Sequence, residues 1–338
     1  MIKNTMCLAL ILAAVPCFAS ASIEQLEKTT GLSMQEVRVD IPAAAAKAEL
    51  LGYAQAVSQF NAYRESKRDG IKNDDNLPFL LTHGDKTANT VVMIHGLTDS
   101  PWYMRKLGEI LYKQGYNVVS LLLPGHGTKP EDLITVTKAQ WQQEVDRGLL
   151  IASGLGEKIS LAGFSTGGAL SLDALRRHPE LKADKLFLFS PALAINESNQ
   201  QMVSLGCKAQ WLAATFKGDY NEPDNTVEDN PYRYNKMAIN GVCQLYSLTV
   251  DNQNGRDAIL GSLRASGTAV FAVESEADTT VSPYAVTNFM ASLPYTSRSE
   301  YIRYPLAEGI AHASVTRPET NSNYPELSNS IRRFAAVN

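Results

Sequence analysis

The sequence has no marked excess of charge of either sign. Its 338 residues include 31 Lys and Arg against 35 Asp and Glu, a net charge of −4, and its pI is about 5.8. A protein that binds a phosphate backbone usually carries clustered basic residues, so nucleic acid is not an expected partner. Because 44% of the residues are hydrophobic, the chain can bury a core, and disorder over most of its length is excluded.

Histidine and cysteine are scarce as well. The five histidines are scattered, without an H-E-x-x-H pattern or a mixed Cys/His cluster, so no metal and no other cofactor is expected. Two of the four cysteines, Cys7 and Cys17, fall near the N-terminus. Cys207 and Cys243 remain and predict a disulfide if the protein reaches an oxidising compartment. Two free buried thiols are the alternative.

The apolar run at the N-terminus is too short to span a membrane, which takes roughly 20 residues. It extends from Met6 to Phe18, follows Lys3, and is followed by Ala19-Ser20-Ala21. This arrangement predicts a secretory signal peptide over residues 1–21 and export to a periplasm or out of the cell. After cleavage, no stable membrane insertion is expected. An uncleaved anchor and lipidation at Cys17 are the alternatives.

Short apolar runs and helical patterns alternate through most of the remaining chain. Continuous apolar strands alternating with helices are typical of an α/β fold, with a mostly parallel sheet covered on both faces. Strands are expected over 89–95, 116–123, 158–163, 185–190, 269–274 and 299–304, and helices over 101–114, 137–153, 166–177, 283–293 and 325–336.

The alternation is interrupted in two places. An Ala-rich stretch before it predicts an N-terminal helix packed against the main body. The polar stretch between the fourth and fifth strands is too long for an ordinary connection and predicts an inserted helical cap over the sheet edge. The expected organisation is a signal peptide at 1–21, an N-terminal helical segment at 22–77, a core at 78–194 and 263–338, and a cap at 195–262.

The strongest chemical motif is Gly163-Phe164-Ser165-Thr166-Gly167, which follows a predicted strand and begins a predicted helix. In that setting G-x-S-x-G is typical of a nucleophile elbow. Gly163 and Gly167 would leave room for a tight turn that raises Ser165 above the sheet edge as a nucleophile. A serine that only caps a glycine-rich helix is the alternative.

A serine hydroxyl needs an adjacent base, which an acid holds in place. In the elbow architecture the acid and then the histidine follow the serine along the chain. This order selects His312, because three histidines precede Ser165 and His178 follows it too closely. Asp278, in the loop after the predicted strand 269–274, is the expected acid, and Glu276 is the second candidate.

Developing negative charge on a substrate oxygen needs fixed hydrogen-bond donors. In this architecture one is the backbone N–H after the nucleophile, here Thr166, and the other comes from a loop after an early strand, where Leu97 is the candidate. His95 precedes that loop and is expected to play a structural role, bonded to backbone groups.

These motifs together resemble the α/β-hydrolase superfamily. The residues that carry the resemblance are His95-Gly96, Pro124-Gly125-His126-Gly127, the Gly163–Gly167 elbow, Asp278 and His312. Within the superfamily, residues 78–338 are similar to the group of monoacylglycerol lipases, lysophospholipases and carboxylesterases. Together with the export that the N-terminus predicts, the resemblance implies a serine hydrolase that cleaves small acyl esters through a Ser-Asp-His triad without a cofactor.

Other activities remain open on the same motifs. The group is also similar to some proline-type aminopeptidases, and peptidases, thioesterases and C–C hydrolases use the same serine chemistry. A catalytically idle binding protein is the alternative from another class, although it needs no Ser, acid and His in this order. In the cap, residues 196–201 are polar and favour soluble or micellar substrates. Aromatic and apolar cap residues either line an acyl pocket or pack the cap interior: Trp211, Leu212, Phe216, Tyr232 and Tyr234.

Overall fold

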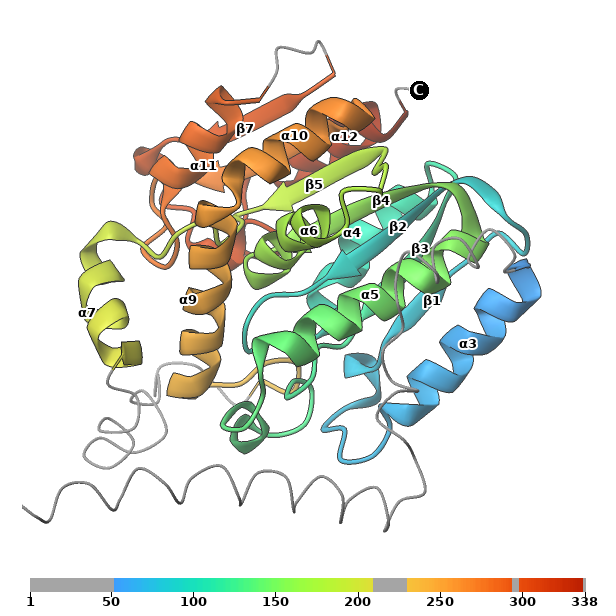
Figure 1. Cartoon of the computed structure of the whole chain (residues 1–338), viewed down its shortest axis with the longest axis horizontal. Coiled ribbons are helices and arrows are strands. Elements are labelled where there is room, and N and C mark those ends of the chain that lie inside the picture. Colours follow the sequence, from blue (N-terminus) through green and yellow to red (C-terminus); the bar gives the residue numbers. More distant parts are fainter. Residues whose placement is uncertain (1–51, 209–229, 294–297, 337–338) are drawn as a thin grey trace, which may run out of the picture. The chain divides into compact units, whose positions relative to one another are not determined.

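The central element is a seven-stranded sheet in a computed structural model that describes residues 52–208, 230–293 and 298–336. These residues all lie in one compact unit, residues 45–338. The strand order is β1-β3-β2-β4-β5-β6-β7 (Figure 1). The strands are β1 (Phe79–Leu81), β2 (Thr87–Ile94), β3 (Tyr116–Leu121), β4 (Gly156–Phe164), β5 (Lys185–Phe189), β6 (Ala269–Ser275) and β7 (Glu300–Tyr304).

The six predicted strands are confirmed, and every pair among them that is in register is parallel. β1 is the strand that the sequence analysis missed. It is only three residues long and pairs antiparallel with β3 at the edge of the sheet. Three residues are too few for an alternating or continuous apolar pattern to stand out from a loop.

Helices cover both faces of the sheet, as the continuous apolar strands predict. Their bounds are α3 (Tyr53–Ser66), α4 (Arg105–Tyr112), α5 (Lys138–Leu155), α6 (Thr166–Arg177), α7 (Glu197–Lys208), α9 (Ile239–Asn254), α10 (Arg256–Ser266), α11 (Pro283–Ala291) and α12 (Tyr324–Ala336), with short 3₁₀ helices at Asp74–Asn76, Pro101–Met104, Pro130–Leu133, Leu306–Glu308 and His312–Ser314. None of the helices among the described residues has the length and apolar character needed to cross a bilayer.

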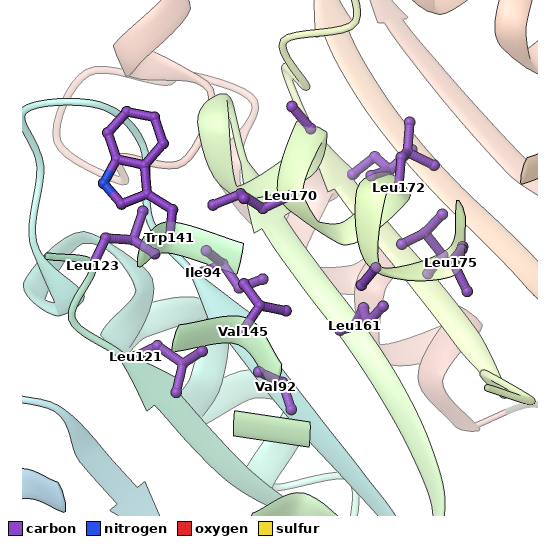
Figure 2. Packing of buried hydrophobic residues seen from close by; sticks show 14 of the residues in the cluster. Val92, Ile94, Leu121, Leu123, Trp141, Val145, Leu161, Leu170, Leu172 and Leu175 are labelled. Atoms are coloured by element: carbon purple, nitrogen blue, oxygen red, sulfur yellow. The ribbon is translucent and has the colours of Figure 1, made fainter. Parts of the chain in front are cut away.

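Neighbouring strand residues point into two different cores. Because successive side chains of a strand face opposite sides of the sheet, Val92 and Ile94 of β2 pack with α5 and α6, whereas Val91 and Met93 pack with α4 and α12. Figure 2 shows the first of these cores, where Trp141 of α5 lies near Leu123. Both faces of β2 are therefore buried in apolar packing. This packing holds the strand, and with it the carboxyl end of the strand, in a fixed position.

The N-terminal helix packs against the main body, as predicted. α3 lies beside α5 (Figure 1) and buries Ala56, Phe60 and Tyr63. At its end, Lys67 forms an ion pair of 2.6 Å with Glu144 of α5. The predicted signal peptide at 1–21 and the lipidation alternative at Cys17 lie outside the described residues.

Helices α7, α9 and α10 lie between β5 and β6, where the cap was expected. A disulfide joins Cys207 of α7 to Cys243 of α9, so the predicted pairing of these cysteines is confirmed. The helix expected to begin near Tyr232 instead begins at Ile239, because residues 230–238 bind neighbouring loops in irregular conformation. Ile259 and Leu263 of α10 belong to the α5–α6 core. Trp211, Leu212 and Phe216 lie outside the described residues.

Candidate active site

The predicted site residues gather at one edge of the sheet. In parallel strands all carboxyl ends meet at the same edge. Ser165 directly follows β4, Asp278 follows β6, His312 follows β7, and the loop that contains Leu97 follows β2. Leu97 and His312, which are 215 positions apart in the sequence, are thus brought to the same edge of the sheet by the topology alone.

Ser165 occupies the sharp turn between β4 and α6. Its backbone has φ 52° and ψ −112°, outside the regions that non-glycine residues normally adopt, and such strain is found mainly at functional sites. The Ser165 N–H donates to the Phe189 carbonyl at 3.0 Å, and the Ser165 carbonyl accepts from Ala192 at 2.9 Å. Because β5 lies beside β4 in the sheet, residues at the end of β5 hold the strained turn at Ser165 in place.

The two elbow glycines are required by close backbone contacts. A Cβ atom at Gly163 would lie 2.2 Å from backbone atoms of Gly167, and one at Gly167 would lie 2.0 Å from the carbonyl oxygen of Ile94. These distances are far below any van der Waals contact. The G-x-S-x-G pattern thus reflects how tightly α6 approaches β2 and β4.

Asp278 and His312 are directly bonded. His312 Nδ1 lies 2.5 Å from Asp278 Oδ2. The other carboxylate oxygen of Asp278 accepts from the backbone N–H groups of Thr280 at 2.7 Å and Val281 at 3.0 Å. Asp278 is 3% exposed. The carboxylate is thus fixed on one side by its own loop and presents the other oxygen to the imidazole.

Glu276, the second candidate for the acid, points elsewhere. Its carboxylate accepts from the Leu306 N–H at 3.0 Å and pairs with Arg303 at 3.3 Å. Glu274 is likewise engaged, because it accepts hydrogen bonds from Tyr301 and Thr287. Burial raises the pKa of Glu274. Of the three carboxylates in this stretch, only Asp278 bonds to His312.

The imidazole of His312 is oriented by the nucleophile turn as well as by Asp278. Its ring lies 5.0 Å, centroid to centroid, from the ring of Phe164, the residue before Ser165. With Nδ1 bonded to Asp278, Nε2 is the ring nitrogen that the carboxylate leaves unbonded. No hydrogen bond joins Ser165 Oγ to His312 among the described residues; such bonds are often long in an enzyme without substrate.

The loop after β2 brings a second backbone donor to the site. Neither the Leu97 N–H nor the Thr166 N–H reaches a protein acceptor within the described ranges. Thr98 has a positive φ of 68°, which is uncommon and costly for a β-branched residue. Its carbonyl accepts from the Tyr234 N–H at 2.9 Å, so a residue far along the chain holds this strained turn.

His95 binds backbone groups on both sides, which confirms the predicted structural role. Its Nδ1 lies 2.8 Å from the Gly96 carbonyl, and its Nε2 accepts from the Leu123 N–H at 3.1 Å. This pattern requires a neutral ring with the proton on Nδ1. Burial lowers the pKa of His95 well below its usual range, which keeps the ring neutral.

Tyr234 is a residue of the site that the sequence analysis did not recognise in this role. Its hydroxyl donates to the Gly125 carbonyl at 3.0 Å and accepts from the Thr128 N–H at 3.0 Å. Together with the bond to Thr98, it ties the loops after β2 and β3 to each other. It is 6% exposed, so it packs inside the protein. No local sequence pattern could reveal this role of Tyr234, because its bonding partners lie more than 100 residues away in the chain.

Metal-binding side chains do not cluster in the part of the chain that the structure describes. No group of three or more His, Cys, Asp or Glu residues there could hold a metal ion. The chemistry available at this edge is that of a strained serine, a carboxylate-bound histidine and unpaired backbone N–H groups.

The parallel sheet, the strained serine turn and the order serine, acid, histidine define the chain as an α/β-hydrolase. The family model described as serine aminopeptidase, S33, matches residues 85–312, and the chain belongs to this family.

Two curated relatives and one solved structure illustrate the similarity. A thermostable monoacylglycerol lipase of Bacillus sp. (strain H-257) is 36% identical over 91 residues, which is 27% of this chain and 36% of that protein. A carboxylesterase of Bacillus subtilis (strain 168) is 26% identical over 183 residues, 54% of this chain and 70% of the relative. The matched part thus spans about a third of the first relative and over two thirds of the second.

The structure of the Paleococcus ferrophilus monoacylglycerol lipase superposes with a TM-score of 0.58 at 16% identity, covering 77% of this chain and 98% of the other. At that identity the likeness concerns the fold. The predicted α/β-hydrolase fold and the predicted family resemblance are confirmed.

Proposed function

We propose that the protein is a serine hydrolase of carboxylic esters, with Ser165 as nucleophile, His312 as base and Asp278 as acid. The observation that carries this proposal is the bond from Asp278 Oδ2 to His312 Nδ1 at 2.5 Å, beside a serine held at φ 52°. A fixed carboxylate selects the tautomer of the histidine and stabilises its protonated form.

The reaction proceeds in two halves. His312 Nε2 takes the proton of Ser165 Oγ, and Oγ attacks the acyl carbon of the ester. The tetrahedral intermediate collapses, His312 returns the proton to the leaving alkoxide, and the alcohol departs. Water then gives a proton to His312 and attacks the acyl-enzyme. Ser165 Oγ leaves with the proton from His312, and the carboxylic acid is released.

The Leu97 and Thr166 backbone N–H groups stabilise the oxyanion of each tetrahedral intermediate in this proposal. A single such donor is worth about 10²–10³ in rate in related chemistry. The positive φ of Thr98 supports the assignment, because it turns the loop after β2 sharply just beyond Leu97. Backbone strain of this kind persists only where surrounding contacts enforce it.

Ester hydrolysis is favoured over amide hydrolysis by the names of the two curated relatives, a monoacylglycerol lipase and a carboxylesterase. A peptidase is the second candidate, because the matching family is described as serine aminopeptidase. Both reactions pass through an acyl-enzyme on serine, so the same residues serve either.

Export and a cap complete the proposal. The signal-like residues 1–21 and the Cys207–Cys243 disulfide both support an oxidising compartment, a periplasm or the exterior. Residues 195–262 are proposed as the cap, with α7 and α9 limiting the size of the substrate. N-terminal sequencing of the protein from its native host would test whether the signal peptide is removed; a chain that still begins at Met1 would contradict its cleavage.

The decisive experiment compares esters with amides. Hydrolysis of p-nitrophenyl acyl esters from short to long chains is measured beside amino-acid p-nitroanilides, with Ser165→Ala as the blank. We expect ester turnover that drops by at least about 10⁴-fold in Ser165→Ala, while circular dichroism shows an unchanged fold. Turnover of the anilides alone would replace the ester assignment with the peptidase. Ester turnover that survives in Ser165→Ala would reject the mechanism.

A further inference from the structure

Two arginines converge on one buried carboxylate beside the candidate active site. Asp99 belongs to the loop after β2, Arg233 to the segment before α9, and Arg317 to the segment after His312. Arg233 Nε lies 3.9 Å from Asp99 Oδ1, and Arg317 Nη2 lies 3.7 Å from the same oxygen. Three segments that are far apart in the sequence thus place two positive charges around one negative charge.

Neither guanidinium is satisfied by this carboxylate. The two distances suit ion pairs but are too long for hydrogen bonds. Arg233 Nε and both Nε and Nη2 of Arg317 are buried and have no hydrogen-bond partner among the described residues. The arginine side chains are only 25% and 18% exposed. Buried donors on charged groups are strongly destabilising unless an acceptor reaches them.

The geometry of Arg317 favours an in-plane ligand. Its guanidinium lies over the ring of Tyr103, 4.1 Å from the ring centroid, and Tyr103 is itself held by Asn230, which donates to its hydroxyl at 2.8 Å. Stacking on Tyr103 occupies the face of the guanidinium group. Its N–H groups point outward in the plane of the group, where they can donate to the oxygens of a ligand. Carboxylate and phosphate oxygens match this fork.

The charge balance also favours an anion. Two arginines stay protonated at any physiological pH, whereas Asp99 supplies at most one negative charge. Burial raises the pKa of Asp99, while Arg317, Arg233 and His312 oppose that rise. The group therefore carries a net positive charge inside the protein, where screening by salt is weak.

This charge lies next to the nucleophile turn. A Cβ atom built on Gly96 would lie 3.2 Å from Asp99 Oδ2 and 2.8 Å from the ring of Phe164. Phe164 precedes Ser165, and its ring contacts His312. The carboxylate of Asp99 therefore lies close to Phe164, the residue that joins it to both Ser165 and His312.

We propose that Arg233 and Arg317 bind an anionic group, a carboxylate or a phosphate, of the ester that Ser165 attacks. The inference rests on the proposed function and narrows its substrate class to negatively charged esters. Asp99 holds the two guanidinium groups near each other when no substrate is bound. The same three residues would also brace the loops if they had only a structural role, so the experiment must separate binding from bracing.

The test uses two matched pairs of substrates. On the acyl side, the mono-p-nitrophenyl ester of glutarate is compared with its neutral methyl ester. On the alcohol side, 1-butyrylglycerol 3-phosphate is compared with 1-butyrylglycerol. The quantity measured is the ratio of kcat/KM for the charged ester to that for its neutral match. The variants are Arg233→Gln and Arg317→Gln, and the control is Arg332→Gln, an exposed arginine of α12 that bonds to Asn329.

We expect the wild type to prefer the charged ester in one of the pairs, and that pair identifies whether the carboxylate or the phosphate is the source. In the same pair, Arg233→Gln and Arg317→Gln should lower the ratio by about tenfold to a hundredfold, the effect of losing a charged hydrogen bond. Arg332→Gln should leave the ratio unchanged. A wild type that prefers the neutral ester in both pairs overturns the proposal, and so does a variant that lowers both rates by the same factor.

A binding measurement keeps this inference separate from the proposed function. Calorimetric titration of Ser165→Ala with sn-glycerol 3-phosphate or glutarate needs no turnover. Saturable binding that Arg317→Gln abolishes supports the anion site even if the esters are not cleaved, in which case only the ester assignment fails. Ester turnover without such binding, and without a preference for either charged ester, rejects the anion site alone.

Discussion

The nucleophile turn and the loop after β2 are built in opposite ways. The turn at Ser165 is held by backbone contacts within and beside its own strand and helix, where glycines allow α6 to approach the Ile94 carbonyl. The loop after β2 is held from outside, by the Tyr234 backbone N–H, which donates to the Thr98 carbonyl, and by the ion pairs of Arg233 and Arg317 with Asp99. A strained turn can therefore be enforced either by local backbone packing or by residues far along the chain.

The first prediction concerns the turn at Ser165, which is held by local backbone contacts. Gly167→Ala places a Cβ 2.0 Å from the Ile94 carbonyl oxygen, and a backbone atom cannot move aside as a side-chain end can. We expect a loss of more than about 3 kcal/mol in the free energy of unfolding and no detectable ester turnover, measured by urea denaturation and a p-nitrophenyl ester assay.

The matched control is Gly261→Ala in α10, where a Cβ would meet nothing within 4 Å. This variant should gain about 0.5–1 kcal/mol, since alanine favours a helix over glycine. Equal stability of the two variants would contradict the local account of the turn.

The second prediction concerns Asp278, the acid proposed to orient His312. Asp278→Asn should lower kcat by about 10⁴-fold, because the amide imposes the wrong tautomer on the imidazole. Glu276→Gln should change kcat by less than about threefold, since Glu276 bonds to Leu306 and Arg303 instead. The two variants differ from the wild type by one group each, and a larger loss in Glu276→Gln would reverse the assignment.

The third prediction concerns the contact between His95, at the end of β2, and His126, in the loop after β3. It is tested through the pH dependence of stability. His126 lies against His95, with 4.9 Å between ring centroids, and burial lowers the pKa of His126 to about 4. An unfolded histidine titrates near 6.5, so the unfolded state binds more protons between these two values. Stability therefore falls as the pH drops through this window, by up to about 3 kcal/mol.

Denaturant titrations at several pH values between 7 and 4 would measure this slope. In His126→Gln the slope should flatten, whereas His83→Gln, at an exposed histidine outside this cluster, should keep the wild-type slope. An unchanged slope in His126→Gln would show that the pH dependence arises elsewhere.

The smallest effect is expected where one hydroxyl is removed. Tyr234→Phe loses the bonds to Gly125 and Thr128 but keeps the backbone bond to Thr98. We expect a loss of about 1–3 kcal/mol in the free energy of unfolding and a decrease of about tenfold in kcat as the Leu97 donor shifts. Tyr284→Phe, at an exposed tyrosine of α11, should change neither quantity. If this control lowered kcat as much as Tyr234→Phe does, the effect would not be specific to the loop after β2.

The sequence by itself determined the parts of this protein whose reasons are local or follow from chain order. Continuous apolar strands predicted a parallel sheet covered on both faces, and G-x-S-x-G between a strand and a helix predicted the turn at Ser165. His312 followed from the order of residues, and the Cys207–Cys243 pair from the small number of cysteines.

Only the tertiary structure decided the features that depend on contacts between distant residues. It placed Asp278 rather than Glu276 against His312, paired the short strand β1 with β3, and clamped Thr98 with Tyr234. It also brought Arg233 and Arg317 to Asp99. The physical reason is that these residues either lie from about 40 to more than 200 positions apart or, like Asp278 and Glu276, compete within one short loop, so their energies depend on packing and direction, which no local pattern encodes.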